Sequence, residues 1–149
     1  MDDVVRTVKH VTYEAAAEAI RAGVDRAREL GVRAGIVVTD ANGEVVTAAK
    51  LDGANPRAWR GGLAKANAAA GLGMSTEAFL EKRLTKDEVL WRALSGNPDS
   101  MFVPGGIPLL HDGKAVGAVG VSGGHYGDDA KVAQAVADRF AELVEGRGA

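Results

Sequence analysis

His125 has the widest chemical scope of any residue in this chain, because an imidazole can act as a general acid, a general base or a metal ligand near neutral pH. It lies in the segment 123–127 (GGHYG), directly before a predicted helix whose first N–H groups can bind an anion. Asp128 and Asp129 follow in the sequence and could orient the ring. We therefore predict His125 as a catalytic residue. The alternative is an exposed loop histidine or a contact to another subunit.

Lys65 is the second predicted catalytic residue, because it is the only charged side chain in the alanine-rich segment 63–70. Desolvation among small apolar side chains lowers the pKa of a lysine and suits it to hold a carboxylate or to act as a base. Two alternatives stay open: a lysine whose ammonium reaches solvent along the helix surface, or an ion pair between subunits.

The predicted ligand-binding residues lie in two glycine-containing loops and one charged region. Glycine lets backbone N–H groups approach an anionic oxygen closely, and arginine suits a carboxylate. The set is Asp52, Arg60, Gly105, Gly106, Ser122, Gly123, Gly124 and Tyr126. Residues 120–124 (GVSGG) match the letters of a nucleophile elbow, but an antiparallel domain of this length cannot supply the α/β-hydrolase sheet that the elbow needs, so no catalytic serine is expected.

The hydrophobic pattern predicts the elements that position these residues. The first helix begins after Thr12 as N-cap, Thr85 and Glu88 form a capping box, and the last helix begins at Asp128 or Asp129. After an extended lead-in over 1–11, helices are predicted over 12–30, 58–71, a short piece from Ser75, 85–94 and a last helix that ends before a frayed segment 146–149. Strands are predicted over 34–39, 44–51, 107–111 and 114–121.

Two hairpins follow from this order, because the pairs Asn42-Gly43 and Asp112-Gly113 are typical of tight hairpin turns. We predict an α/β (α+β) fold with a central antiparallel sheet of two hairpins flanked by helices. The first and last helices should cover one face. With 149 residues and no linker, the chain is predicted as a single domain over 1–149.

Composition argues against several function classes. A formal net charge of -2 without a basic run argues against a nucleic-acid partner. The lack of cysteine excludes disulfides, thiol nucleophiles and Cys-bound metals, and no His-x-x-x-His or Glu-x-x-His spacing occurs, so no dedicated metal site is predicted. No apolar stretch has the length of a membrane span or the form of a signal peptide, so we expect a cytoplasmic protein without a membrane partner.

Five segments occur in a set order along the chain: 38–43 (VTDANG), 51–54 (LDGA), 64–66 (AKA), 105–108 (GGIP) and 117–124 (GAVGVSGG). Their order and spacing resemble the GlcG/HbpS family, which also includes the C-terminal domain of PduO-type proteins, and Asp129 matches the acid that follows the glycine loop. The resemblance implies a profilin-like or PAS-like sandwich, a homo-oligomer and, for some members, bound haem.

The chain departs from the family pattern at three places. Ala58 stands where a serine is common, Ala68 where a threonine is common, and Lys50 and Leu51 where an arginine is common. The loss of two hydroxyls and an arginine changes the polarity expected of the pocket.

Three functions stay open on the sequence. The first is an oligomeric small-molecule-binding protein that holds haem or another tetrapyrrole, with His10 or His125 as axial ligand; His111, beside a turn, is expected to face solvent. The second is a small cofactor-independent enzyme for isomerisation, elimination or cyclisation of an acidic carbonyl compound, with His125 as acid or base and Lys65 holding an anionic oxygen. The third is an oligomeric accessory protein without ligand.

Overall fold

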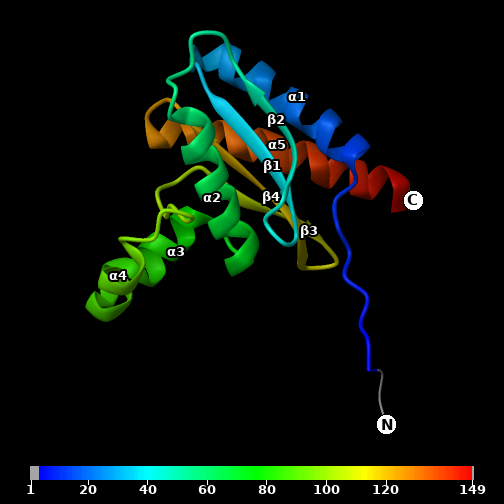
Figure 1. The fold of residues 1–149 in the computed structure, drawn as a ribbon. Helices are drawn as coiled ribbons and strands as arrows, with labels where there is room; N and C mark the ends of the chain where they lie inside the picture. Colours follow the sequence, from blue (N-terminus) through cyan, green and yellow to red (C-terminus); the bar gives the residue numbers. More distant parts are fainter. Residues whose placement is uncertain (1–3, 149) are drawn as a thin grey trace.

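A four-stranded antiparallel sheet separates two layers of helices in the computed structural model, which describes residues 4–148 (Figure 1). Along the chain the elements are α1 (Tyr13–Leu30), β1 (Gly35–Asp40), β2 (Val45–Lys50), α2 (Ala58–Leu72), α3 (Thr76–Lys82), the 3-10 turn η1 (Leu84–Lys86), α4 (Glu88–Leu94), β3 (Gly106–His111), β4 (Lys114–Ser122) and α5 (Tyr126–Gly148). No helix among these residues is long and apolar enough to cross a membrane.

The sheet consists of two hairpins joined side by side, in the strand order β2-β1-β4-β3. The two central strands, β1 and β4, pair antiparallel from Gly35 opposite Ser122 to Asp40 opposite Gly117. This arrangement confirms the predicted central antiparallel sheet of two hairpins flanked by helices.

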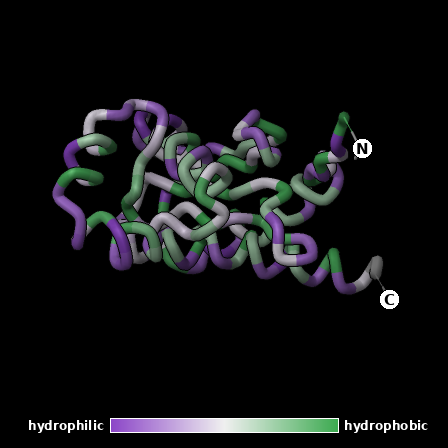
Figure 2. The backbone as a smooth tube through the Cα atoms, turned by 90° about the horizontal axis from the view of Figure 1, so that it is seen from below, coloured by the Kyte–Doolittle hydropathy of each residue, from purple (hydrophilic) through white to green (hydrophobic). Residues whose placement is uncertain are grey.

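One face of the sheet is covered by α1 and α5, as predicted (Figure 1). The side chains between the two layers are almost all aliphatic, and the largest fully buried ones include Ile36, Val38, Val119, Val132 and Val136. Hydrophilic and hydrophobic stretches alternate along α5 in Figure 2, as expected of a helix with one face on the core.

The opposite face is covered by α2, whose small side chains let its backbone lie directly against the sheet. A Cβ on Gly120 of β4 would overlap the carbonyl oxygen of Gly62 in α2, and a Cβ on Gly106 of β3 would overlap that of Lys65. On this side α3 reaches β3 through the buried Thr76, whereas α4 stands away from the sheet and has no buried residue (Figure 1).

Three predicted helix boundaries are wrong. The last helix begins at Tyr126, so Asp128 and Asp129 lie in its first turn rather than at its N-cap. Thr85 lies in η1, and the N-cap of α4 is Asp87, whose carboxylate accepts the N–H of Leu90 at 3.0 Å. The helix also continues through 146–148, where a frayed end was expected. Residues 1–3 and 149 lie outside the described residues, and 4–10 contain no helix or strand.

Candidate functional site

Lys65 lies at a buried junction of three elements. Its Nζ donates to the carbonyl oxygen of Val121 at the end of β4 (2.8 Å) and to Oδ2 of Asp129 in α5 (3.1 Å). Both charged side chains belong to residues that are only 2% exposed. The other carboxylate oxygen of Asp129 accepts the N–H of Gly124 at 3.0 Å. The pair therefore connects α2 with α5 past the end of β4.

Burial shifts the pKa values of both partners toward their neutral forms. The pKa of Lys65 is lowered from 10.5, because desolvation of the ammonium outweighs the attraction of Asp129. The pKa of Asp129 is raised from 3.8, because desolvation of the carboxylate outweighs the attraction of Lys65 and the hydrogen bond from Gly124. The predicted lowering of the Lys65 pKa is confirmed. The side chain is, however, buried, so no ligand can reach it in this structure.

The lowered pKa of Lys65 predicts a specific pH dependence of stability. Between that pKa and 10.5 the unfolded chain holds a proton that the folded chain has lost, so the free energy of unfolding rises with pH in this window. In this window we expect wild type to gain stability relative to a Lys65→Met/Asp129→Leu variant as the pH rises toward 10.5. Urea unfolding at several pH values measures the difference, and a flat or falling difference would contradict the lowered pKa.

The glycine loops are packed against the chain's own backbone. The N–H of Gly106 donates to Oγ1 of Thr76 at 3.1 Å, and that of Gly124 donates to Asp129. Gly105 has a φ of 129°, and a Cβ there would meet the carbonyl oxygen of Val121 at 2.7 Å. Two of the amides expected to hold a ligand oxygen are thus engaged within the fold. Close packing of α2 accounts for glycine at position 106, the carbonyl of Val121 in β4 accounts for it at 105, and the side chain of Val32 accounts for it at 124.

The remaining predicted ligand-binding residues do not converge. Ser122 faces Gly61 of α2, where a Cβ would lie 2.6 Å from the serine Oγ. Arg60 is exposed on α2. Asp52 lines a separate cavity of about 620 Å³ near the end of α1. The structure therefore brings Lys65 together with Gly105, Gly106 and Gly124, but not with Asp52, Arg60 or His125.

Two of the three histidines use Nδ1 to accept a backbone hydrogen bond. His10 accepts from the N–H of Ala41 at 3.2 Å, and His125 accepts from Gly127 at 3.0 Å. In a neutral imidazole, Nε2 then carries the proton and is a donor. His125 is also exposed, and its ring lies 4.1 Å from that of Tyr126, which is 51% exposed. Asp129, expected to orient His125, instead faces Lys65.

His111 has the opposite arrangement. It ends β3, and the Asp112-Gly113 turn that follows has positive φ at both residues (50° and 76°), as hairpin turns of this kind require. The turn places Oδ2 of Asp112 3.4 Å from Nδ1 of His111. Unlike in His10 and His125, no backbone N–H among the contacts of the described residues donates to Nδ1 of His111.

His111 lines two neighbouring cavities. The first is an apolar groove of about 590 Å³ between α1 and α5, and its lining residues are Thr12, Glu14, Ala15, Glu18, His111, Phe140, Leu143 and Val144. The second is a basic cleft of about 360 Å³, and its lining residues are Arg6, Thr7, Val8, Lys9, His111, Asp112, Lys114, Ala115 and Val116. His111 reaches solvent, as expected, with about a third (35%) of its side chain accessible.

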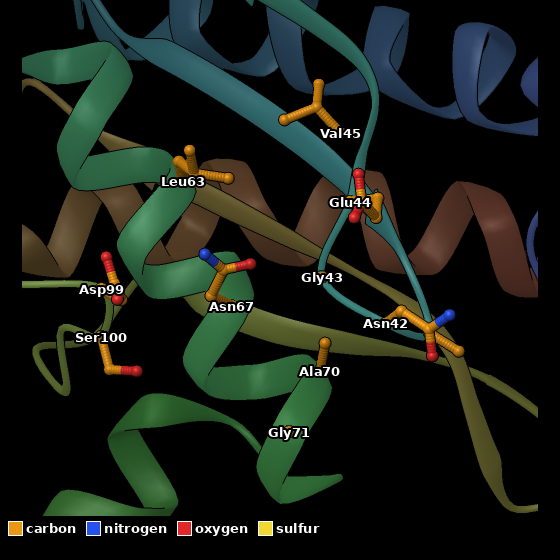
Figure 3. Close-up of a pocket in the computed structure, with 11 residues that line it drawn as sticks. Asn42, Gly43, Glu44, Val45, Leu63, Asn67, Ala70, Gly71, Asp99 and Ser100 are labelled. Carbon is orange, nitrogen blue, oxygen red and sulfur yellow. The ribbon is translucent and has the colours of Figure 1, made fainter.

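A polar cavity of about 500 Å³ opens on the other face of the sheet (Figure 3). Asn67 of α2 lies opposite Gly43 and Glu44 of the β1–β2 turn, and Asp99 and Ser100 close it from the loop before β3. Its lining has two carboxylates, no cation and no histidine, so it suits hydrogen-bond donors. None of the predicted site residues lines it. Within residues 4–148, no three His, Asp or Glu side chains are grouped to hold a metal ion.

Comparison with known proteins decides the family. The family model described as "Haem degrading protein HbpS-like" matches residues 11–138. This chain belongs to the HbpS-like family. The membership confirms the resemblance found in the sequence segments.

Solved structures related to this HbpS-like chain share its fold. Protein ORFY of Klebsiella pneumoniae is 26% identical with a TM-score of 0.86, covering 95% of this chain and 97% of that one. A double mutant of HbpS from Streptomyces reticuli is 32% identical with a TM-score of 0.81, covering 93% and 92%. A PduOC:heme complex is 22% identical with a TM-score of 0.78, covering 87% and 94%, a likeness that shows the fold alone.

Proposed function

We propose that this HbpS-like chain binds haem or a closely related tetrapyrrole in the apolar groove between α1 and α5. The observation that carries the proposal is a groove in which His111 lies together with the apolar side chains of Ala15, Phe140, Leu143 and Val144. The haem named in the family description and in the PduOC complex supports this ligand class.

The lining of the groove fits such a ligand chemically. A macrocycle has two apolar faces whose transfer out of water is favourable, and Phe140, Leu143 and Val144 supply an apolar wall. The volume of about 590 Å³ lies in the range of small-molecule sites. A bound haem supplies an iron centre whose behaviour is set by its axial ligand and by the polarity around it.

The geometry supports the enzyme alternative less well. Lys65 is only 2% exposed and engaged with Asp129, and none of the four cavities described above includes it. His125 has no acidic side chain orienting its ring among the contacts of the described residues. Self-association and a cytoplasmic location remain predictions; the exposed apolar side chains of Val89 (79%) and Trp91 (49%) on α4 support the first of them.

A haemin titration followed by visible absorption tests the proposal. Wild type should give a saturable, shifted Soret band. Leu143→Glu should weaken binding roughly tenfold or more, because it places a charge against the apolar faces of the ligand. Val45→Glu makes the same kind of change at an exposed position on β2, outside the groove, and should bind as wild type does. An unsaturable titration of wild type would overturn the proposal, and a Leu143→Glu protein with unchanged affinity would remove the groove as the site.

A further inference from the structure

We propose that His111 is the axial ligand of the bound tetrapyrrole through Nε2, and that Arg6, Lys9 and Lys114 bind its acidic side groups. This assignment rests on the proposed function and adds the orientation of the ligand. The macrocycle would extend from His111 along the groove between α1 and α5, while its carboxylates point into the basic cleft beside β4.

The first step of the argument is the position of the available lone pair. The axial position on iron needs an unprotonated imidazole nitrogen. In His10 and His125 a backbone N–H already donates to Nδ1, so Nε2 carries the proton of the neutral ring. Among the contacts of the described residues no backbone N–H donates to Nδ1 of His111, so its neutral ring is not held with the proton on Nε2; the nearest acid, Asp112, lies 3.4 Å from Nδ1.

The second step is the position of His111 between two different surfaces. It lines both the apolar groove and the basic cleft, so a ligand centred on its ring would contact the two at once. A haem has this same division, with an apolar ring and two carboxylates at one edge. The histidine therefore stands where the two chemical halves of such a ligand would meet.

The third step is the sign of the charges on the two sides. The groove carries Glu14 and Glu18, of which Glu18 pairs with Arg139, so carboxylates of the ligand would be repelled there. The cleft carries Arg6, Lys9 and Lys114, and within residues 4–148 no carboxylate forms a salt bridge with any of them. Its one acid, Asp112, faces His111. The charges therefore favour the orientation in which the carboxylates of the ligand lie in the basic cleft and its ring lies in the apolar groove.

Two probes separate iron ligation from carboxylate binding: haemin and metal-free protoporphyrin IX. His111→Ala should weaken haemin binding roughly tenfold or more and move the Soret band, while the affinity for protoporphyrin IX changes little. Added imidazole should restore the Soret position of the His111→Ala complex. Lys114→Glu should weaken binding of both probes, because both carry the two carboxylates.

Matched controls make the outcomes distinct. His10→Ala and His125→Ala should leave both affinities and the Soret position unchanged, and Lys86→Glu, a charge reversal on η1, should bind as wild type does. The assignment fails if His111→Ala keeps the wild-type haemin spectrum, or if His10→Ala or His125→Ala alters it. The proposed function itself fails if folded wild type binds neither probe saturably. Far-UV circular dichroism confirms that each variant is folded.

Discussion

Replacing Asp129 by alanine should lower the free energy of unfolding by about 3–5 kcal/mol, the usual cost of leaving a buried charge without its partner. The ammonium of Lys65 would keep one hydrogen bond, to the carbonyl of Val121, but would have no counter-charge in a position where it is 2% exposed. The N–H of Gly124 would lose its acceptor as well. Urea unfolding monitored by circular dichroism measures the loss.

The double variant Lys65→Met/Asp129→Leu serves as the matched control. Removing both charges removes the desolvation cost together with the attraction, so this variant should recover most of the lost stability, as apolar replacements of buried ion pairs often do. If Asp129→Ala alone costs less than about 1 kcal/mol, the pair is accessible to water in solution and behaves as a surface ion pair.

Gly120→Ala should have an even larger effect on folding. The added Cβ would overlap the carbonyl oxygen of Gly62 and lie 2.5 Å from the nitrogen of Ala66, and both of these atoms belong to the backbone of α2. A helix backbone cannot move aside as a side chain can, so α2 would have to leave the sheet. We expect a loss of more than about 4 kcal/mol, or no folded protein at all.

Gly71→Ala is the control for this substitution. Gly71 lies in the last turn of the same helix, and a Cβ there meets nothing within 4 Å. Alanine at this position should stabilise the protein by about 0.5–1 kcal/mol through helix propensity alone. Thermal unfolding of the two variants in parallel measures the stability lost by Gly120→Ala and the stability gained by Gly71→Ala. A folded Gly120→Ala protein of wild-type stability would contradict the close packing of α2.

The parts of the fold that depend on local chemistry could be predicted from the sequence. Thr12 accepts the N–H of Ala15, and Gly31 ends α1 with a φ of 71°, as expected of an N-cap and a left-handed C-cap. Where two local signals compete, the prediction fails: Thr85 has the letters of a capping box, but the carboxylate of Asp87 caps α4. Thr85 lies inside η1 instead, where its hydroxyl donates to the carbonyl oxygen of Glu81 at 3.1 Å.

The candidate site depended on contacts between distant parts of the chain, which a single sequence does not contain. Lys65 and Asp129 are 64 positions apart, so the closed ion pair could not be foreseen from the alanine-rich segment alone. The glycines that suggested a ligand cradle mark contacts between two backbones instead. His111 was passed over because its turn predicts solvent exposure, and its place between two cavities depends on the packing of α1 and α5 and on the segment 6–9.

The buried pair between α2 and α5 has a consequence for how the molecule opens. Because α2 covers one face of the sheet and α5 the other, separating either helix from β4 would leave a charge of the pair without its partner in an apolar surrounding. Partial openings that release a single layer are therefore disfavoured relative to complete unfolding. The two layers should exchange their slowest amide hydrogens at a common rate, as one cooperative unit rather than as two.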